Sequence, residues 1–125
     1  MNQKNVILII DDDPRNIFAL KMVLKARGYN CETATNFGDA VEILKSGKDV
    51  KLVLMDMMMP DVDGYESIAH LKSSEEFKNL PIIAVTAQAM AGDKEKCLEA
   101  GADGYVSKPI NIDHLLVFTD KFLQK

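Results

Sequence analysis

Short apolar runs alternate along this chain with segments whose apolar residues recur at helical spacing. Five of these runs are predicted to be strands, at residues 6–10, 31–34, 52–55, 82–85 and 104–106. A segment with a helical period follows each strand. Strands that alternate with helices in this way are typical of a parallel sheet covered by helices on both faces. We therefore expect an α/β fold with five strands and five helices.

The first strand and the helix after it have the clearest signals. The segment Val6–Ile10 is continuously apolar and rich in β-branched residues, as expected for a central strand buried on both faces. Asp13 can cap the next helix, Pro14 occupies its first position, and Gly28 ends it. The buried face of that helix is predicted to contain Ile17, Leu20 and Leu24.

The other elements are predicted from similar start and stop signals. Residues 31–34 are few and mixed in polarity, which is typical of an edge strand. Asn36 can cap a helix that runs through Ser46, and Asn111 can cap the last helix. Two further helices are predicted at about residues 65–72 and 92–100, the second of them ended by Gly101. The last helix is predicted to bury Ile112, Leu115, Leu116 and Phe122.

Charged residues stand where three of the predicted strands end. Right-handed crossovers favour the flavodoxin-like strand order 2-1-3-4-5, a doubly wound sheet in which the first and third strands are neighbours. Ligand sites of such sheets lie beyond the carboxyl ends of the strands, where the chain changes direction. Asp11 and Asp12 follow the first strand, Asp56 ends the third, and Lys108 follows the fifth. We therefore expect these four side chains to meet at one site.

Carboxylates gathered beside a lysine suit phosphoryl transfer. A carboxylate can act as the nucleophile, while a divalent cation and an ammonium group neutralise the phosphoryl oxygens. Mg²⁺ prefers hard oxygen ligands such as the paired carboxylates. Taken alone, the acid pair is explained as well by a solvated loop with a helix cap, and the lysine by a surface role. Their coincidence at strand ends favours a functional site.

Composition narrows the class of protein. The 125 residues, 47% hydrophobic and 27% charged, predict one globular domain over residues 1–125, with no linker and no room for an output domain. A net charge of −4, without any Lys or Arg run longer than a pair, argues against direct binding to nucleic acid. No apolar stretch approaches the ~20 residues of a membrane span, and the N-terminus is not a signal peptide. Cys31 and Cys97 lack metal-site spacing and are predicted to be buried free thiols, so we expect a cytoplasmic location.

Four motifs at these strand ends resemble those of the response-regulator receiver domains of two-component signalling. They are IIDDDP at residues 9–14, MDMMMPDVDG at 55–64, AVTA at 84–87 and GADGYVSKP at 101–109. They occur in the order of the family, and the similarity covers about residues 6–123. The segment 86–90 is also similar to receivers that are attached to hybrid histidine kinases or work with them.

The resemblance implies that Asp56 is a phosphoacceptor. Its donor would be a phosphohistidine of a sensor histidine kinase or of a histidine phosphotransfer protein. The cofactor would be Mg²⁺ or Mn²⁺, bound directly by Asp12, Asp56 and the backbone carbonyl of Met58, and through water by Asp11. The side chain of Met58 would also overhang the site, and with Gln88 it occupies a position that tunes dephosphorylation in the family.

Three further positions carry roles implied by the family. Thr86 would hydrogen-bond a phosphoryl oxygen, and the small Ala87 would leave access to the aspartate. Lys108 would pair with Asp56 at rest and with the phosphoryl group afterwards, and the peptide bond to Pro109 is commonly cis.

The family also implies how the signal leaves the domain. When the hydroxyl of Thr86 turns toward the phosphoryl group, the ring of Tyr105 moves inward. The surface near Ala89, Met90 and Tyr105 would then bind a downstream protein target, and a dimer that forms on phosphorylation is a further expectation.

Three other functions are alternatives to this one. A haloacid-dehalogenase-like phosphatase needs Asp-x-Asp, whereas Asp56 is followed by Met57 and Met58. A flavodoxin-type FMN protein needs a Ser, Thr or Gly phosphate loop after the first strand, where this chain has three aspartates. An adaptor that acts without phosphorylation would be expected to have lost one of the site residues. The other methionines of 55–59 are predicted to fill the core, and His70 and His114 to lie on helix surfaces.

Overall fold

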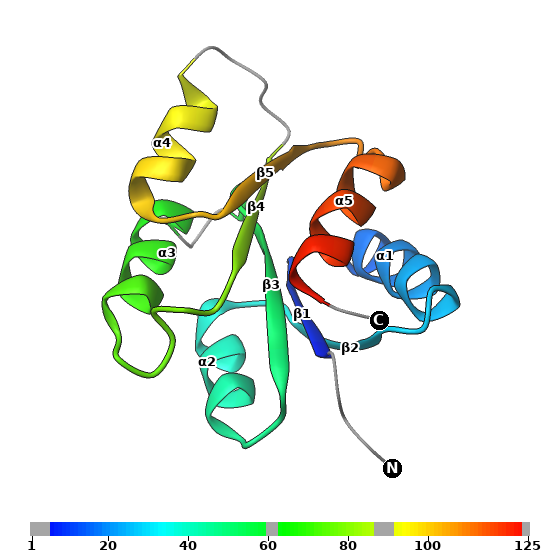
Figure 1. Cartoon of the computed structure of the whole chain (residues 1–125), viewed down its shortest axis with the longest axis horizontal. Coiled ribbons are helices and arrows are strands. Elements are labelled where there is room, and N and C mark those ends of the chain that lie inside the picture. Colours follow the sequence, from blue (N-terminus) through cyan, green and yellow to red (C-terminus); the bar gives the residue numbers. More distant parts are fainter. Residues whose placement is uncertain (1–5, 60–62, 87–91, 124–125) are drawn as a thin grey trace.

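The computed structural model describes residues 6–59, 63–86 and 92–123, which form a parallel five-stranded sheet flanked by helices (Figure 1). The sheet has the order β2-β1-β3-β4-β5, and every pair of neighbouring strands is parallel. The strands are β1 (Val6–Ile10), β2 (Asn30–Ala34), β3 (Val50–Asp56), β4 (Ile82–Thr86) and β5 (Gly104–Ser107). The helices are α1 (Pro14–Ala26), α2 (Phe37–Lys45), α3 (Gly64–Ser73), α4 (Asp93–Ala100) and α5 (Ile112–Phe122). The predicted α/β, flavodoxin-like doubly wound fold is confirmed.

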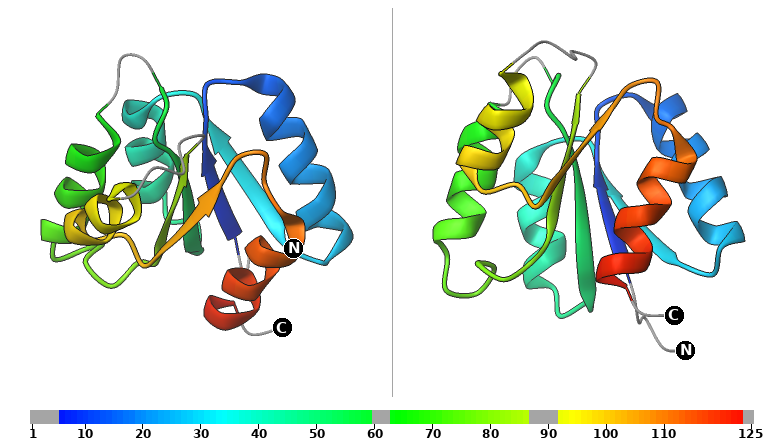
Figure 2. Two further views of the ribbon diagram at one scale, coloured as in Figure 1. Left: turned by 90° about the horizontal axis from the view of Figure 1, so that it is seen from above. Right: turned by 45° about the horizontal axis from the view of Figure 1, so that its top comes forward.

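Helices cover both faces of the sheet (Figure 2): α1 and α5 lie on one face, and α2, α3 and α4 on the other. Successive residues of the central strands point to opposite faces, so each strand contributes to two cores. One core includes Ile7, Ile9, Leu52 and Leu54 with Leu20, Leu24 and Leu115. The other includes Leu8, Ile10, Val53 and Met55 with Ala40, Leu44, Ile68, Leu71 and Cys97. This two-sided burial explains why β1 is apolar throughout.

Side-chain caps fix the helix starts at the edge where the charged residues lie. The carboxylate of Asp13 accepts a hydrogen bond from the backbone N–H of Arg15 at 3.0 Å, and Pro14 follows as the first helical residue. Asn36 and Asn111 cap α2 and α5, as predicted. Asp63 caps α3, although it was not among the predicted caps.

The structure corrects two expectations about burial. Cys97 is fully buried, but Cys31 is only half-buried because β2 is the edge strand. In α5, Leu115 and Leu116 are buried, whereas Ile112 and Phe122 are half-exposed near the two ends of the helix. None of the helices in the described part of the chain has the length and apolar character that crossing a bilayer requires.

Candidate functional site

Three carboxylates meet at the carboxyl edge of the sheet, beside the chain reversal between β1 and β3. Ile10 pairs with Met55 in the sheet register, so Asp11 and Asp56 leave neighbouring strands at the same level. Asp11, Asp12 and Asp56 each place a carboxylate oxygen within 4.8 Å of the other two, and we call these residues the acid cluster. Asp11 and Asp56 are 2% and 3% exposed, whereas Asp12 is exposed. The cluster is therefore a partly buried concentration of negative charge that is open to solvent on one side.

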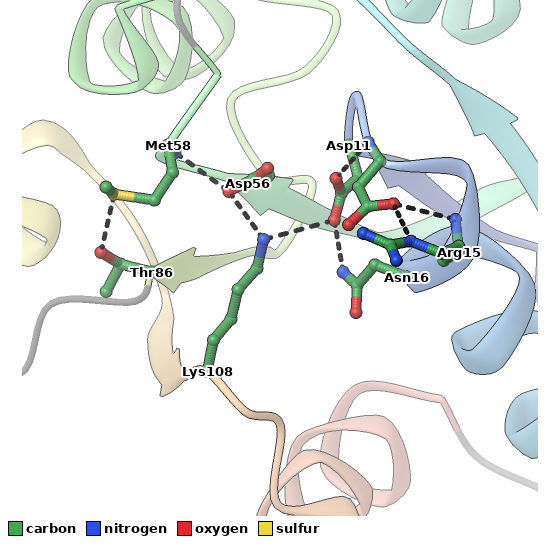
Figure 3. A network of polar contacts seen from close by, with 8 residues as sticks. Asp11, Arg15, Asn16, Asp56, Met58, Thr86 and Lys108 are labelled. Carbon is green, nitrogen blue, oxygen red and sulfur yellow. Dashed lines mark hydrogen bonds and ion pairs between the residues drawn. The ribbon is translucent and has the colours of Figure 1, made fainter.

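Lys108 reaches into the acid cluster from the end of β5 (Figure 3). Its Nζ lies 3.3 Å from Oδ1 of Asp56 and 3.6 Å from Oδ2 of Asp11. The backbone N–H of Lys108 donates to the carbonyl of Thr86 at 2.7 Å, which attaches this segment to the end of β4. The peptide bond to Pro109 is cis, as the resemblance implied. The predicted pairing of Lys108 with Asp56 is present.

The carboxylate of Asp56 is buried, and its contacts offset only part of the cost of burying its charge. Burial raises the pKa of its carboxyl above the usual range. The backbone N–H of Met58 donates to Oδ1 of Asp56 at 2.9 Å and lowers this pKa. The negative charge of Asp11 raises the pKa of Asp56, and the positive charge of Lys108 lowers it. The carboxylate form is thus less favourable than in a free aspartate, and an added cation at the cluster would favour it.

Asp11 is held by contacts on both of its oxygens. The backbone N–H of Asp13 donates to Oδ1 at 2.8 Å. The side-chain Nδ2 of Asn16 donates to Oδ2, the oxygen that also faces Lys108 (Figure 3). Asn16 was not among the predicted site residues. Its only signal is position, because a helix capped by Asp13 brings its first turn back over Asp11.

Met58 and Thr86 meet on the other side of Asp56. The hydroxyl of Thr86 donates to the sulfur of Met58 at 3.6 Å, so the Met58 side chain lies over the site, as predicted. Met58 is 43% exposed, in contrast to Met55 and Met59, which fill the core. Met57 is half-buried against the same core.

Tyr105 lies on the same face of the sheet as Thr86. Ser107 pairs with Thr86 and Tyr105 pairs with Ala84, so Tyr105 stands one side-chain repeat below Thr86 on the neighbouring strand. Its ring is half-buried. The predictions for Ala87, Gln88, Ala89 and Met90 concern positions outside the described residues.

The two histidines lie on helix surfaces, as predicted. Both are exposed, and the ring of each lies close to one phenylalanine ring. His70 meets Phe37 edge-on with 6.1 Å between ring centroids, and His114 lies 5.3 Å from Phe118. These contacts assign neither histidine a place in the site.

Comparison with known proteins agrees with the fold and identifies the family of the chain. The family model of the response regulator receiver domain matches residues 7–119. The chain is 39% identical over 112 residues to the sensor histidine kinase RcsC of Escherichia coli K12, and this match covers 90% of this chain but only 12% of RcsC. It is 32% identical over 117 residues to the polar-differentiation response regulator DivK of Brucella anthropi, and this match covers 94% of this chain and 94% of DivK.

Solved structures with the same fold include two that bear on the site. One is the receiver domain of the sensor histidine kinase PA1611 of Pseudomonas aeruginosa, with a magnesium ion coordinated in its active-site cleft; the TM-score is 0.83 at 30% identity, covering 98% of this chain and 99% of that one. Another is the receiver domain of Ssk1 of Saccharomyces cerevisiae, co-crystallised with the histidine phosphotransfer protein Ypd1; the TM-score is 0.84 at 26% identity, covering 98% and 90%.

Proposed function

The chain belongs to the response-regulator receiver family, and from this we propose that it is a phosphoacceptor of a two-component phosphorelay, with Asp56 as the acceptor. Residues 1–125 would form one receiver domain. The observation that carries the proposal is the convergence of Lys108 and two further aspartates on a buried carboxylate at the end of a central strand. Neither a dehalogenase-like phosphatase nor an FMN protein belongs to this family, so those alternatives are set aside.

The reaction would be a self-catalysed phosphoryl transfer rather than turnover of a separate substrate. An oxygen of Asp56 attacks the phosphorus of a phosphohistidine, and the phosphorus–nitrogen bond breaks with its electron pair passing to the imidazole. Lys108 is 3.3 Å from Asp56 and can follow the negative charge from the carboxylate to the phosphoryl oxygens. Thr86 can offer its hydroxyl to another of these oxygens once it leaves the Met58 sulfur. Slow hydrolysis of the aspartyl phosphate would reset the domain.

The donor set of the acid cluster fits Mg²⁺ or Mn²⁺. Both ions favour carboxylate and carbonyl oxygens, and Mg²⁺ keeps several waters, which the exposed side of the cluster at Asp12 allows. Asp12, Asp56 and the Met58 carbonyl would hold the ion directly, and Asp11 through water. When bound, the ion neutralises charge on the transferring group. Magnesium in the cleft of the PA1611 receiver supports this assignment.

The partner that delivers the phosphoryl group would be a sensor histidine kinase or a histidine phosphotransfer protein. The Ypd1 complex of the Ssk1 receiver supports this class of partner. On this chain, Phe18 and Met22 are 65% and 58% exposed and lie one helical turn apart on α1, which begins beside the acid cluster. We place the docking surface there. Changing Phe18 to Ala should slow transfer from the partner while leaving phosphorylation by acetyl phosphate intact.

The signal would leave through a surface that includes Tyr105. Thr86 and Tyr105 lie on one face of neighbouring strands, which supports their coupling. Such a switch biases two existing states and needs only a few kcal/mol of differential binding. A downstream protein, or a second copy on phosphorylation, would bind that surface. The free thiols fit a reducing, cytoplasmic location.

The deciding experiment is intact mass after incubation with acetyl phosphate and Mg²⁺. Wild type should gain one phosphoryl group and Asp56→Asn none; equal labelling of both would refute the assignment. A thermal shift series then tests the metal. Wild type should be stabilised as Mg²⁺ rises, because the ion binds only the folded chain, whereas Asp12→Ala should respond much less. An adaptor that acts without phosphorylation would show neither effect.

A further inference from the structure

Asn16 touches the acid cluster, although it carries no charge and no role in the proposed transfer. It lies in the first turn of α1 and is half-buried. Its Nδ2 donates to Oδ2 of Asp11 (Figure 3). A carboxylate can only accept hydrogen bonds, so the amide nitrogen and not the amide oxygen must face it. This contact leaves the amide oxygen directed away from Asp11.

The contact determines how Asp11 is oriented. Asp11 is 2% exposed, so its carboxylate depends mainly on protein donors in the resting domain. Its Oδ1 is held by the backbone N–H of Asp13 at 2.8 Å, and its Oδ2 by Asn16. With one donor on each oxygen, the plane of the carboxylate is fixed in the cluster. An oriented acid needs no rearrangement when a cation or its water arrives.

The contact also affects Lys108. The ammonium group lies between two carboxylates, 3.3 Å from Asp56 and 3.6 Å from the same Asp11 oxygen that Asn16 holds. Without the Asn16 donor, Oδ2 of Asp11 would depend on Lys108 alone. The ammonium would then be drawn toward Asp11 and away from Asp56.

A side chain at this position must donate a hydrogen bond to Asp11 and must leave the charge of the acid cluster unchanged, and only a neutral donor does both. An acidic side chain would add a fourth negative charge and could not donate to Asp11. A Lys or Arg would cancel the charge of Asp11 and repel an incoming cation. An amide supplies the hydrogen bond and leaves the charge of the cluster unchanged.

We propose that Asn16 is a positioning residue for the divalent cation. It holds Asp11 in the orientation in which the Asp11 carboxylate accepts a hydrogen bond from a water bound to the ion, and it keeps the Lys108 ammonium group available to pair with Asp56. The inference rests on the proposed function, because it assumes a cation at the acid cluster. Groups that orient metal-binding carboxylates typically change metal affinity by about 10- to 100-fold when removed.

The test is a Mg²⁺ titration of wild type, Asn16→Ala and Asn16→Gln followed by backbone amide chemical shifts. The dissociation constant should rise roughly tenfold or more in Asn16→Ala and be partly restored in Asn16→Gln, which keeps the amide. Asn36→Ala is the matched control. Asn36 also donates its Nδ2 to a carboxylate at a helix start, Asp39 at 3.0 Å, but outside the cluster. This control should lose stability and keep its Mg²⁺ affinity.

A second readout needs no substitution. In wild type, the side-chain NH₂ resonances of Asn16 should shift on addition of Mg²⁺, and those of Asn36 should not. Equal Mg²⁺ affinity of wild type and folded Asn16→Ala, or an Asn16 signal that ignores Mg²⁺ while other site residues respond, would overturn the role of Asn16 and leave the proposed function standing. No response of wild type to Mg²⁺ at all would overturn both.

Discussion

The acid cluster should make the resting domain less stable than it could be, and Asp56→Asn should show this directly. Asp56 is 3% exposed and shares its site with Asp11 and Asp12. The amide of Asn has nearly the same shape, and its oxygen can still accept from the backbone N–H of Met58. The substitution therefore removes one buried negative charge with little change in packing.

The magnitude follows from the distances in the cluster. At an effective dielectric constant of about 20, two charges of the cluster, which are at most 4.8 Å apart, repel by at least about 3.5 kcal/mol. On the same scale, Lys108 at 3.3 Å attracts Asp56 by about 5 kcal/mol. Asp12 is exposed, so its repulsion is screened, while burial adds a desolvation cost to Asp56. The attraction to Lys108 exceeds the repulsion from Asp11 by about 1.5 kcal/mol at most, and a desolvation cost of several kcal/mol outweighs this difference, so we expect the ionised Asp56 to cost roughly 1–2 kcal/mol of folding free energy.

The effect must depend on pH in a defined direction. Burial raises the pKa of Asp56 in the folded chain above 3.8, the value of a free carboxyl, so the folded chain binds this proton more tightly than the unfolded chain does. The resulting stabilisation is complete below the unfolded pKa and is lost as the pH rises through the folded pKa. Asn does not titrate. The gain in free energy of unfolding of Asp56→Asn over wild type should therefore be absent in acid. It should grow as the pH rises from the unfolded to the folded pKa of Asp56, and stay constant above that window.

The assay is urea or thermal unfolding followed by circular dichroism, in EDTA, over a pH series. Above the window, Asp56→Asn should unfold about 3–8 °C higher than wild type. Asp63→Asn is the control, because it makes the same change at an exposed cap of α3, where Asp and Asn cap about equally well. The reasoning fails if Asp56→Asn is no more stable than wild type at neutral pH, or if its advantage shrinks as the pH rises.

Three further predictions concern other parts of the chain. Lys108→Ala should keep a folded domain, because the side chain is partly exposed, yet fail to give the beryllofluoride-activated NMR spectrum; an unchanged activated spectrum would rule out its role. Gly104→Ala should destabilise the fold by about 1–3 kcal/mol in urea unfolding, since the added Cβ would lie 2.5 Å from the ring of Phe118. Burial raises the pKa of the Cys31 thiol to about 11, so it should react slowly with a disulfide reagent at pH 8 until urea unfolds the protein; rapid labelling of the native chain would contradict this.

The fold could be predicted because local signals and global packing agree. The residues of β1 alternate between two cores, and only a strand buried on both sides requires five apolar residues in succession. Caps at Asp13, Asn36 and Asn111 were readable because the capping side chain and the helix it caps are adjacent in sequence. Burial at element ends was less predictable. Residues 31–34 were predicted to be an edge strand, yet the exposure of Cys31 also depends on how much of that edge the neighbouring helix covers.

The acid cluster was predictable for a different reason. In a parallel sheet the carboxyl ends of all strands share one edge, so a charged residue after a strand has a known location once strand order is known. Asp11, Asp56 and Lys108 each follow or end a strand, and register places the first two side by side. Beyond this location, the motifs supply the proposed chemistry, namely which carboxylate would accept the phosphoryl group and which oxygens would bind the cation.

The individual contacts between side chains of the site could not be predicted from the sequence, because they depend on differences in atomic position of about an ångström. Asn16 reaches Asp11 only because Asp13 caps α1 and turns its first residues back over the strand end. Met58 covers Thr86 because the loop after β3 carries its thioether across Asp56 at 3.6 Å from the hydroxyl. Each of these contacts depends on a neighbour that lies on another element. Such residues can adjust metal affinity or phosphoryl lifetime while the four motifs stay intact, so receivers with the same motifs need not share the same switching properties.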